Sequence, residues 1–175
     1  MYVGHVGVAL GAKGVRPQVP LWTLVIAAQG PDWIDGCLLA LGLGTDLTSQ
    51  LSHSIPSAVA VALAIGYLTA RAMRSSPAGW TVAVIYLLHL PADYITGRKP
   101  LFPGGPKVGF QLYSHAKWDL VLEVAVISIG WWYYRRSLPE ERRNGLLVFV
   151  LPAVLFTIQL LADLIFSMRN HGFPV

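Results

Sequence analysis

The chain has 175 residues, of which 54% are hydrophobic and 13% are charged, about half the charged share of an ordinary soluble domain. Together with a mean hydropathy of +0.54, this composition excludes an ordinary soluble domain and predicts an integral membrane protein. The formal net charge of +4 does not indicate nucleic-acid binding, because the 13 Lys and Arg residues lie almost entirely in short gaps between apolar segments, where membrane proteins carry them.

The elements expected along the chain are helices. A short one is expected over about residues 2–12, and five longer apolar stretches cover residues 21–44, 55–73, 80–95, 118–134 and 146–166. Each long stretch lies within or near the ~17–25 residues that cross a bilayer as a helix, whereas open strands would leave their backbone unsatisfied in lipid. The short element, at ~1.5 Å per residue, would cover about half the membrane, so it is either re-entrant or packed against the bundle. We therefore predict an all-α integral membrane helical bundle of about five transmembrane helices, forming a single domain over residues 1–175.

The gaps and one internal proline refine this prediction. Pro31 removes a backbone hydrogen bond, so Gly30-Pro31 is expected to break its helix and present Asp32 and Asp35 inward. Alternating the gaps across the membrane puts eight basic residues on one face and five on the other: Lys13, Arg16, Arg71, Arg74, Arg135, Arg136, Arg142 and Arg143 against Arg98, Lys99, Lys107, Lys117 and Arg169. The positive-inside rule makes the first face cytoplasmic. His171, in the tail, is expected to be solvated.

Ionisable residues inside the apolar stretches are the main functional signal. Asp32, Asp93, Glu123 and Asp163 lie there, and each would cost ~2.5–3.5 kcal/mol at a helix centre if it were unpaired. His89 precedes Asp93 by four residues, so both side chains share one helical face. Partners such as histidines, basic residues or a metal ion are therefore required.

The predicted depth of these residues in the membrane places several of them close together. In the predicted topology, three histidines and three aspartates from four elements fall in one layer of the outer half of the membrane: His5, His53, His89, Asp32, Asp35 and Asp93. Imidazole and carboxylate together form the ligand set of a zinc-like ion. More than four ligands suggest two ions, with Asp93 bridging them. Taken singly, His89-x3-Asp93 could be a structural hydrogen bond and His53-Ser54 a helix cap.

A second group of polar residues could extend this site or be structural. His115, Asp119 and Glu123 are spaced by four residues, and the simpler alternative is that Lys117 and Arg98 neutralise these acids at the interface. Asp163, one turn after Gln159, is expected to make a polar contact between helices. Cys37 lies in an apolar stretch and is expected to be a buried, inert thiol.

These motifs resemble one known family. They occur in the same order in the bacterial and archaeal family of LexA-regulated, inner-membrane, metal-dependent hydrolases: His5, Pro31-Asp32-x-x-Asp35, His53-Ser54, and His89-x3-Asp93 followed by Gly97 and Pro103. The resemblance covers nearly the whole chain. That family is distantly similar to the zinc-dependent phospholipase C and single-strand nuclease group, in which a helical bundle holds a zinc cluster.

The resemblance implies a ligand set for one metal ion, made of Asp32 or Asp35, His53, His89 and Asp93, with His5 joining Asp93 on another. The sequence departs from the family pattern before His53, where Gln50-Leu-Ser stands in place of a second basic or histidine residue. The third metal of the soluble group would need a further histidine, which only His115 with Asp119 could supply in part.

The function expected from the sequence is hydrolysis of a phosphoester in a membrane lipid by a metal-activated water. Whichever of Asp32 and Asp35 is not a ligand would be the general base, and cations of the long outer loop would hold the substrate phosphate, namely Arg98, Lys99 and Lys107. The protein would be a multi-pass protein of the inner (cytoplasmic) membrane with its site toward the outer leaflet. The alternative is a non-enzymatic membrane protein with a structural or transported metal ion. In either case the expected cofactor is a divalent metal, most simply zinc, with one or two ions bound.

Overall fold

The structure, a computed structural model, describes residue 1 and residues 3–170, with the side chains of these residues except 46, 47, 49 and 166–170. Eight α-helices make up most of this part of the chain: α1 (Gly4–Val15), α2 (Leu21–Ala40), α3 (Asp46–Ser52), α4 (Ile55–Ala72), α5 (Ser76–Thr96), α6 (Ala116–Ser137), α7 (Glu140–Arg143) and α8 (Leu146–Asn170). The 3-10 helix η1 (Leu112–Ser114) precedes α6. The strands described are two residues each, β1 (Lys99–Pro100) and β2 (Lys107–Val108), paired antiparallel. The all-α prediction is therefore confirmed.

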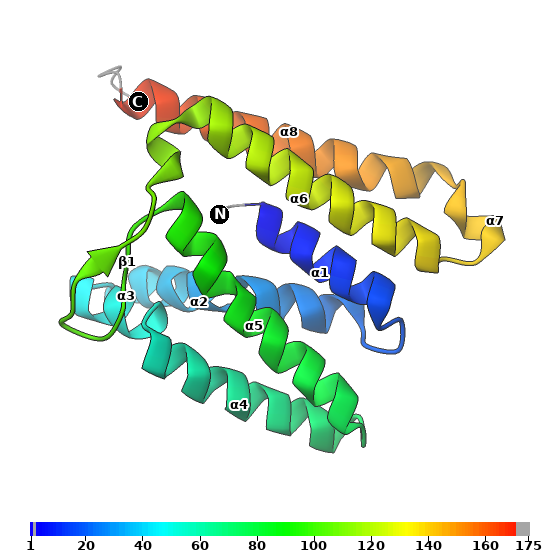
Figure 1. Cartoon of the computed structure of the whole chain (residues 1–175), viewed down its shortest axis with the longest axis horizontal. Coiled ribbons are helices and arrows are strands. Elements are labelled where there is room, and N and C mark those ends of the chain that lie inside the picture. The colour runs from blue at the N-terminus through cyan, green and yellow to red at the C-terminus, as the bar shows by residue number, and fades with distance from the viewer. Residues whose placement is uncertain (2, 171–175) are drawn as a thin grey trace.

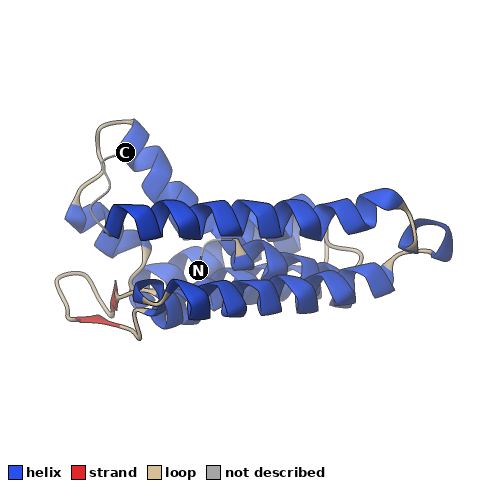
Figure 2. Cartoon of the chain, turned by 90° about the horizontal axis from the view of Figure 1, so that it is seen from above, coloured by secondary structure: helices blue, strands red, loops and turns tan. Residues whose placement is uncertain are grey.

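The long helices pack side by side in an order that differs from the chain order. Across the molecule the neighbours are α4, α5, α2, α1, α6 and α8 (Figure 1). Seen from above, the long helices run along the length of the molecule, with the β1–β2 hairpin at one end (Figure 2). The short α1 would be about 18 Å long at 1.5 Å per residue. It packs between α2 and α6, so of the two arrangements expected for it, the one against the bundle is found.

The helices α1 and α6 cross with their backbones almost in contact. A Cβ added to Gly7 would lie 2.8 Å from the Cα of Ile127, and a Cβ added to Gly130 would overlap the carbonyl group of Gly7. Small residues allow membrane helices to approach this closely. Because His5 lies two residues before Gly7 on α1, this crossing also fixes the position of His5 along the length of the bundle.

The predicted break at Gly30-Pro31 is wrong, because α2 continues through both residues to Ala40. A proline inside a helix removes the hydrogen bond to the carbonyl four residues earlier, here that of Ala27. Membrane helices tolerate this loss when neighbouring groups and local adjustments satisfy the freed carbonyl. Asp32 and Asp35 are thus presented by a continuous helix.

Two helices are long and apolar enough to cross a membrane within the part of the chain that the structure describes. They are Ile55–Ala72, with a mean hydropathy of 1.5, and a window of α8, Leu146–Ile165, with 2.2. Helices α2, α5 and α6 have 20, 21 and 22 residues and so reach spanning length, but they carry the ionisable residues of the site, which lower their hydropathy. The bundle of five spans stays a prediction for these three.

The outer surface of the bundle is rich in large apolar side chains. Trp22 is 67% exposed, Leu68 63% and Leu147 80%, whereas soluble monomers rarely expose extensive apolar patches. The expectation that Cys37 is buried is wrong, since its side chain is exposed. Its apolar neighbours indicated a hydrophobic environment, but this part of α2 faces outward, and the exposed Leu39 lies two residues further along.

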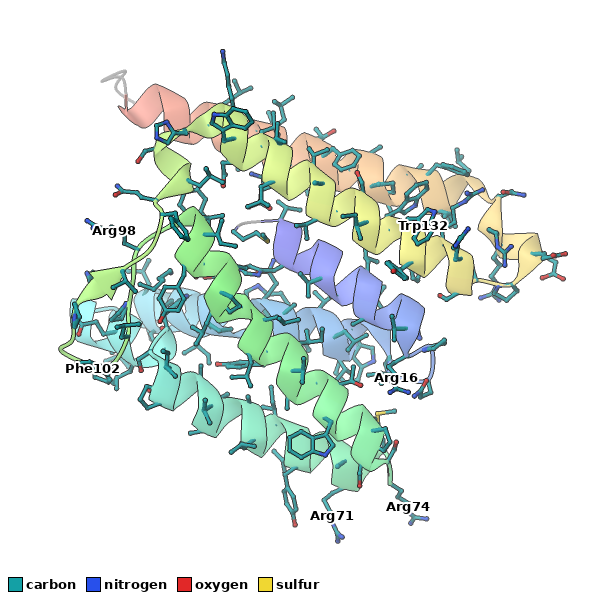
Figure 3. The ribbon with its side chains drawn as sticks, viewed as in Figure 1. Arg16, Arg71, Arg74, Arg98, Phe102 and Trp132 are labelled. Carbon is teal, nitrogen blue, oxygen red and sulfur yellow. The ribbon has the colours of Figure 1, made fainter. Side chains whose placement is uncertain are left out.

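Basic residues lie at both ends of the bundle. Figure 3 shows Arg16, Arg71 and Arg74 at one end and Arg98 at the opposite end, near the hairpin. The Arg136 guanidinium lies 4.0 Å over the ring of Trp132. This arrangement matches the two faces expected from the sequence, while the side chain of residue 169 and the whole of residue 171 lie outside the described residues. Which end faces the cytoplasm stays a prediction.

Candidate metal centre

The last turns of α5 supply two buried candidate ligands. His89 and Asp93 lie four residues apart, and the helical repeat brings His89 Nε2 to 3.2 Å from Asp93 Oδ2. The two residues are 1% and 3% exposed. The spacing that indicated a shared helical face is confirmed as a direct contact.

Two further side chains reach the same point from α2 and from the junction between α3 and α4. His53 Nε2 lies 3.2 Å from Asp32 Oδ1 and 3.4 Å from Asp93 Oδ2. Asp32 Oδ1 also lies 3.6 Å from His89 Nε2. One ligand atom from each of the four residues falls within 4.8 Å of all the others. We call Asp32, His53, His89 and Asp93 the four-residue cluster.

The spacing of the four-residue cluster suits a tetrahedral ion. Atoms bound tetrahedrally to zinc at about 2.0–2.1 Å lie about 3.3 Å from one another, and the four distances given above run from 3.2 to 3.6 Å. Two imidazole nitrogens and two carboxylate oxygens are also donors that zinc accepts. The distances within the cluster and its donor atoms are therefore both those expected of a zinc site.

Outer partners orient both histidines of the cluster. His89 Nδ1 donates to the carbonyl oxygen of Ala28 at 2.8 Å, which leaves Nε2 directed at the cluster. His53 Nδ1 lies 2.8 Å from Ser52 Oγ and 3.3 Å from Asp35 Oδ2, and the Ser52 hydroxyl in turn donates to Asp35. Carboxylate or carbonyl partners of this kind fix the tautomer of a metal-binding histidine. Asp32 thus lies in the cluster, and Asp35 lies behind His53.

His5 reaches the other side of Asp93. Its Nε2 lies 3.3 Å from Asp93 Oδ1, and its ring stacks on that of His89 with centroids 3.9 Å apart. The amine of Met1 donates to the same Oδ1 at 3.0 Å and also to the hydroxyl of Thr96. The two oxygens of Asp93 therefore face different groups, as a bridging carboxylate would require.

Two buried atoms of the cluster fit a cation in particular. His89 Nε2 and Asp93 Oδ2 lie within ion-pair distance of each other, and Asp93 Oδ2 also of His53 and Lys99, but neither atom makes a hydrogen bond of good geometry within the described part of the chain. A buried polar atom without a well-formed hydrogen bond is costly, and an ion held between the two atoms would bind both directly. Burial lowers the pKa of His53, but its close contacts with the carboxylates of Asp32, Asp35 and Asp93 outweigh burial and raise the pKa to about 10. An ion must displace this proton, because only neutral imidazole binds a metal.

A cavity opens onto the cluster. It has a volume of about 490 Å³, and its walls include Asp32, Asp93, Lys99 and Tyr113, with apolar side chains such as Leu155 of α8 opposite. Lys99, on β1, places Nζ 3.1 Å from Asp93 Oδ2. Of the three cations expected to hold a phosphate, Lys99 lines this cavity, whereas the exposed Arg98 and Lys107 are not among its lining residues.

The second group of polar residues forms a separate buried layer between α6 and α8. Asp119, Glu123 and Asp163 are 1%, 0% and 9% exposed, and Glu123 accepts from the backbone N–H of Gly4. His115 is exposed and lies before the first residue of α6, so the structure does not place it with these acids. Lys117 and Arg98 form none of the ion pairs described for this part of the chain, so the alternative in which they neutralise the acids finds no support.

Gln159 joins the second layer to the N-terminal segment. Its Oε1 accepts from Val3 N at 3.2 Å, and its Nε2 donates to Asp163 Oδ1 at 3.0 Å. The contact between helices expected of Asp163 is made with Asp119 of α6, while Gln159, on the same helix as Asp163, links Asp163 to the backbone just before α1.

Several contributors to the site carry no sequence signal. The carbonyl of Ala28 and the hydroxyls of Ser52 and Thr96 contact site residues, but these residue types are common in any helix or turn. Ser52 belongs to the Gln50-Leu-Ser segment that departs from the family pattern, and this departure is the one sequence feature that draws attention to it.

The comparisons with known proteins agree with the membrane prediction. A family model described as YdjM inner membrane protein matches residues 2–166, nearly the whole chain. No curated protein and no solved structure matches, so the expected similarity to phospholipase C stays a prediction. The chain therefore belongs to the YdjM inner membrane protein family.

Proposed function

We propose that the protein is a membrane-embedded, metal-dependent hydrolase that cleaves a phosphoester in a lipid. The observation that carries the proposal is the cavity of about 490 Å³ whose walls combine Asp32 and Asp93 of the four-residue cluster with Lys99 and apolar side chains. Its volume lies within the usual range for small-molecule sites. A cavity with cationic and apolar walls suits a molecule with a phosphate and a hydrocarbon part.

The four-residue cluster would hold one divalent ion, most simply zinc, and His5 with Asp93 Oδ1 could take part in holding a second. When bound, such an ion supplies Lewis-acid activation of water and of a phosphoryl oxygen. Lys99 would hold a non-bridging phosphate oxygen by a charge-assisted hydrogen bond.

The two aspartates of α2 take different roles in this proposal. Asp32 is 36% exposed and lines the cavity, so its second oxygen is available to accept the proton of the attacking water. Asp35 contacts His53 and Ser52 instead, and it is a positioning residue. The buried acids Asp119, Glu123 and Asp163 would support the N-terminal segment that carries His5.

The expected topology gives the substrate a route. The hairpin end of the bundle, with Lys99 and Arg98, would face outward, and the opposite end, with Arg16, Arg71 and Arg74, would face the cytoplasm (Figure 3). His89 and Asp93 lie in the last turns of α5 before this hairpin. A lipid of the outer leaflet could then bring its phosphate to the cluster.

The second candidate is a structural or transported metal ion. One observation favours this second candidate. The four donor atoms of the cluster lie close enough together to fill all four positions around an ion, and such a closed site leaves no position for a reactive water. The two candidates differ in whether Lys99 matters, because an ion alone does not need an anion-binding lysine beside it.

Purified zinc-loaded protein should release phosphate or a phosphorylated headgroup from a panel of membrane phospholipids and polyprenyl phosphates. Lys99→Gln should raise KM about tenfold or more, because hydrogen bonds to charged groups contribute ~1.5–3 kcal/mol, without changing zinc content. Lys107→Gln, on the exposed strand β2, is the matched control. Zinc retention without hydrolysis of any panel member would favour the structural or transport candidate.

Asp35→Asn separates positioning from proton transfer. Loss of an orienting carboxylate lowers metal affinity by about 10–100-fold, so turnover should fall at limiting zinc and recover at saturating zinc. If turnover stays low at saturating zinc, Asp35 is the base and Asp32 is not.

A further inference from the structure

A second cavity lies on the opposite side of α2 from α1. It has a volume of about 670 Å³ and runs between α2 and α4, with α5 behind it. Its walls are almost entirely apolar, with Trp22, Ile26 and Trp33 from α2 and Ile65 and Leu68 from α4 among the residues that form them. Trp22, Ile26, Trp33 and Leu68 are 46–67% exposed, so the cavity is a groove that opens to the outside of the bundle.

The dimensions of the groove fit a hydrocarbon chain and not a helix. The wall from α4 extends from Val61 to Ala72, which is about 16 Å at 1.5 Å per residue, and one leaflet contributes about half of the ~30 Å hydrocarbon thickness. A partner helix with its side chains is about 10–12 Å wide and would need far more room than 670 Å³ over that length. An extended chain from one leaflet matches the length and the volume.

The groove adjoins the metal cavity. Trp33 lines both of them, and Asp32 of the four-residue cluster is its neighbour in the chain. The α2 wall of the groove runs from Trp22 to Leu38, so the groove extends to both sides of Trp33 and for the greater part toward Trp22, away from the hairpin. A lipid with its phosphate at the cluster would therefore have a chain path that begins beside the phosphate and runs along α2.

The base of the groove is formed by Tyr86 of α5. Tyr86 is 2% exposed and its hydroxyl is buried, while its ring packs against the bare backbone of Gly30, where a Cβ would lie 2.6 Å from the ring. An occupant of the groove therefore meets the edge of this ring and not the hydroxyl.

We infer that the groove between α2 and α4 binds one hydrocarbon chain of the lipid substrate. The inference rests on the proposed function for the identity of the lipid as substrate. It specifies a long-chain lipid, in place of any water-soluble phosphoester.

The test uses the full-length protein in lipid-detergent micelles and a photoreactive phosphatidic acid with a diazirine near the end of one acyl chain. After irradiation, labelled peptides are identified by mass spectrometry. Labels should concentrate on the groove walls of α2 and α4. Ile65→Trp, which fills the groove, should reduce this labelling about tenfold, since overpacking costs 1–3 kcal/mol. Leu63→Trp, two residues away on another face of α4 and 54% exposed, is the matched control.

Zinc content, measured in every variant, should stay at the wild-type level.

The outcomes separate the groove from the hydrolase. Groove labelling without hydrolysis of any phosphoester supports the chain site and removes the proposed function. Hydrolysis with labels spread evenly over all outward-facing helices, or with equal labelling of the Ile65→Trp and Leu63→Trp variants, overturns the groove and leaves the proposed function intact.

Discussion

His89→Ala is the sharpest test of the metal centre. The substitution removes Nε2, which lies 3.2 Å from Asp93 Oδ2 and 3.6 Å from Asp32 Oδ1. Altering a partner that only orients a ligand lowers metal affinity by about 10–100-fold, so loss of a ligand itself should lower zinc affinity by more than ~100-fold. At 1.4 kcal/mol for each factor of ten, this is at least about 2.8 kcal/mol.

His89→Ala should also lower the free energy of unfolding by a smaller amount that does not depend on metal. It removes the hydrogen bond to the Ala28 carbonyl, of about 1 kcal/mol, and the stacking on His5, of about 0.5–1.5 kcal/mol. Zinc bound only to the folded state adds RT ln(1 + [L]/Kd) to the free energy of unfolding. The zinc-dependent part of this free energy should therefore shrink by at least about 2.8 kcal/mol in excess zinc.

Two measurements check this prediction. Zinc per chain is determined after dialysis, and thermal unfolding is followed in detergent with and without a chelator. His115→Ala is the control, because His115 is an exposed histidine outside the cluster. If His89→Ala keeps both the zinc content and the chelator-sensitive shift of the wild type, the four residues do not form the ligand set.

Three further predictions concern the fold. Single cysteines at the exposed positions Ser76 and Pro103, on a cysteine-free background, should label from opposite sides of the membrane, with position 103 reactive from outside in intact cells; the reverse would invert the topology. Gly130→Ala should destabilise the protein by about 1–3 kcal/mol or more through overpacking. Gly36→Ala, with open space around it, is the control and should stabilise the protein by ~0.5–1 kcal/mol. Equal melting temperatures for the two variants would contradict the close crossing of α1 and α6. Gln159→Leu should cost about 2–3 kcal/mol by leaving buried polar groups unpaired, and a melting temperature within error of the wild type would refute its bridging role.

Local spacing was sufficient to predict the centre of the site. The four-residue interval from His89 to Asp93 determines a shared helical face, and the limited thickness of a bilayer brings residues at equal depth together. For these reasons His5, Asp32 and His53 could be expected near the same point. The division of labour between Asp32 and Asp35 could not be predicted, since it depends on the rotation of α2 about its axis.

Other features depend on tertiary contacts that no short pattern encodes. Pro31 was expected to break its helix, but a membrane helix tolerates an internal proline where tertiary packing and local adjustments compensate for the lost hydrogen bond. Lys99 and Arg98 are adjacent in sequence, and only the hairpin geometry turns the first toward Asp93. Cys37 lies among apolar residues in a helix whose apolar faces point both inward and outward, so composition alone could not assign its environment.

The distance along the chain between the ligands has a consequence for biogenesis in the multi-pass arrangement proposed above. Asp32 leaves the ribosome well before its partners His53 and His89, and a lone aspartate at mid-membrane costs ~2.5–3.5 kcal/mol on insertion scales. The helix α2 should therefore remain loosely integrated, close to the insertion machinery, until α5 emerges. Ribosome-bound chains that stop before α5 should leave α2 extractable by alkali, while longer chains should resist extraction.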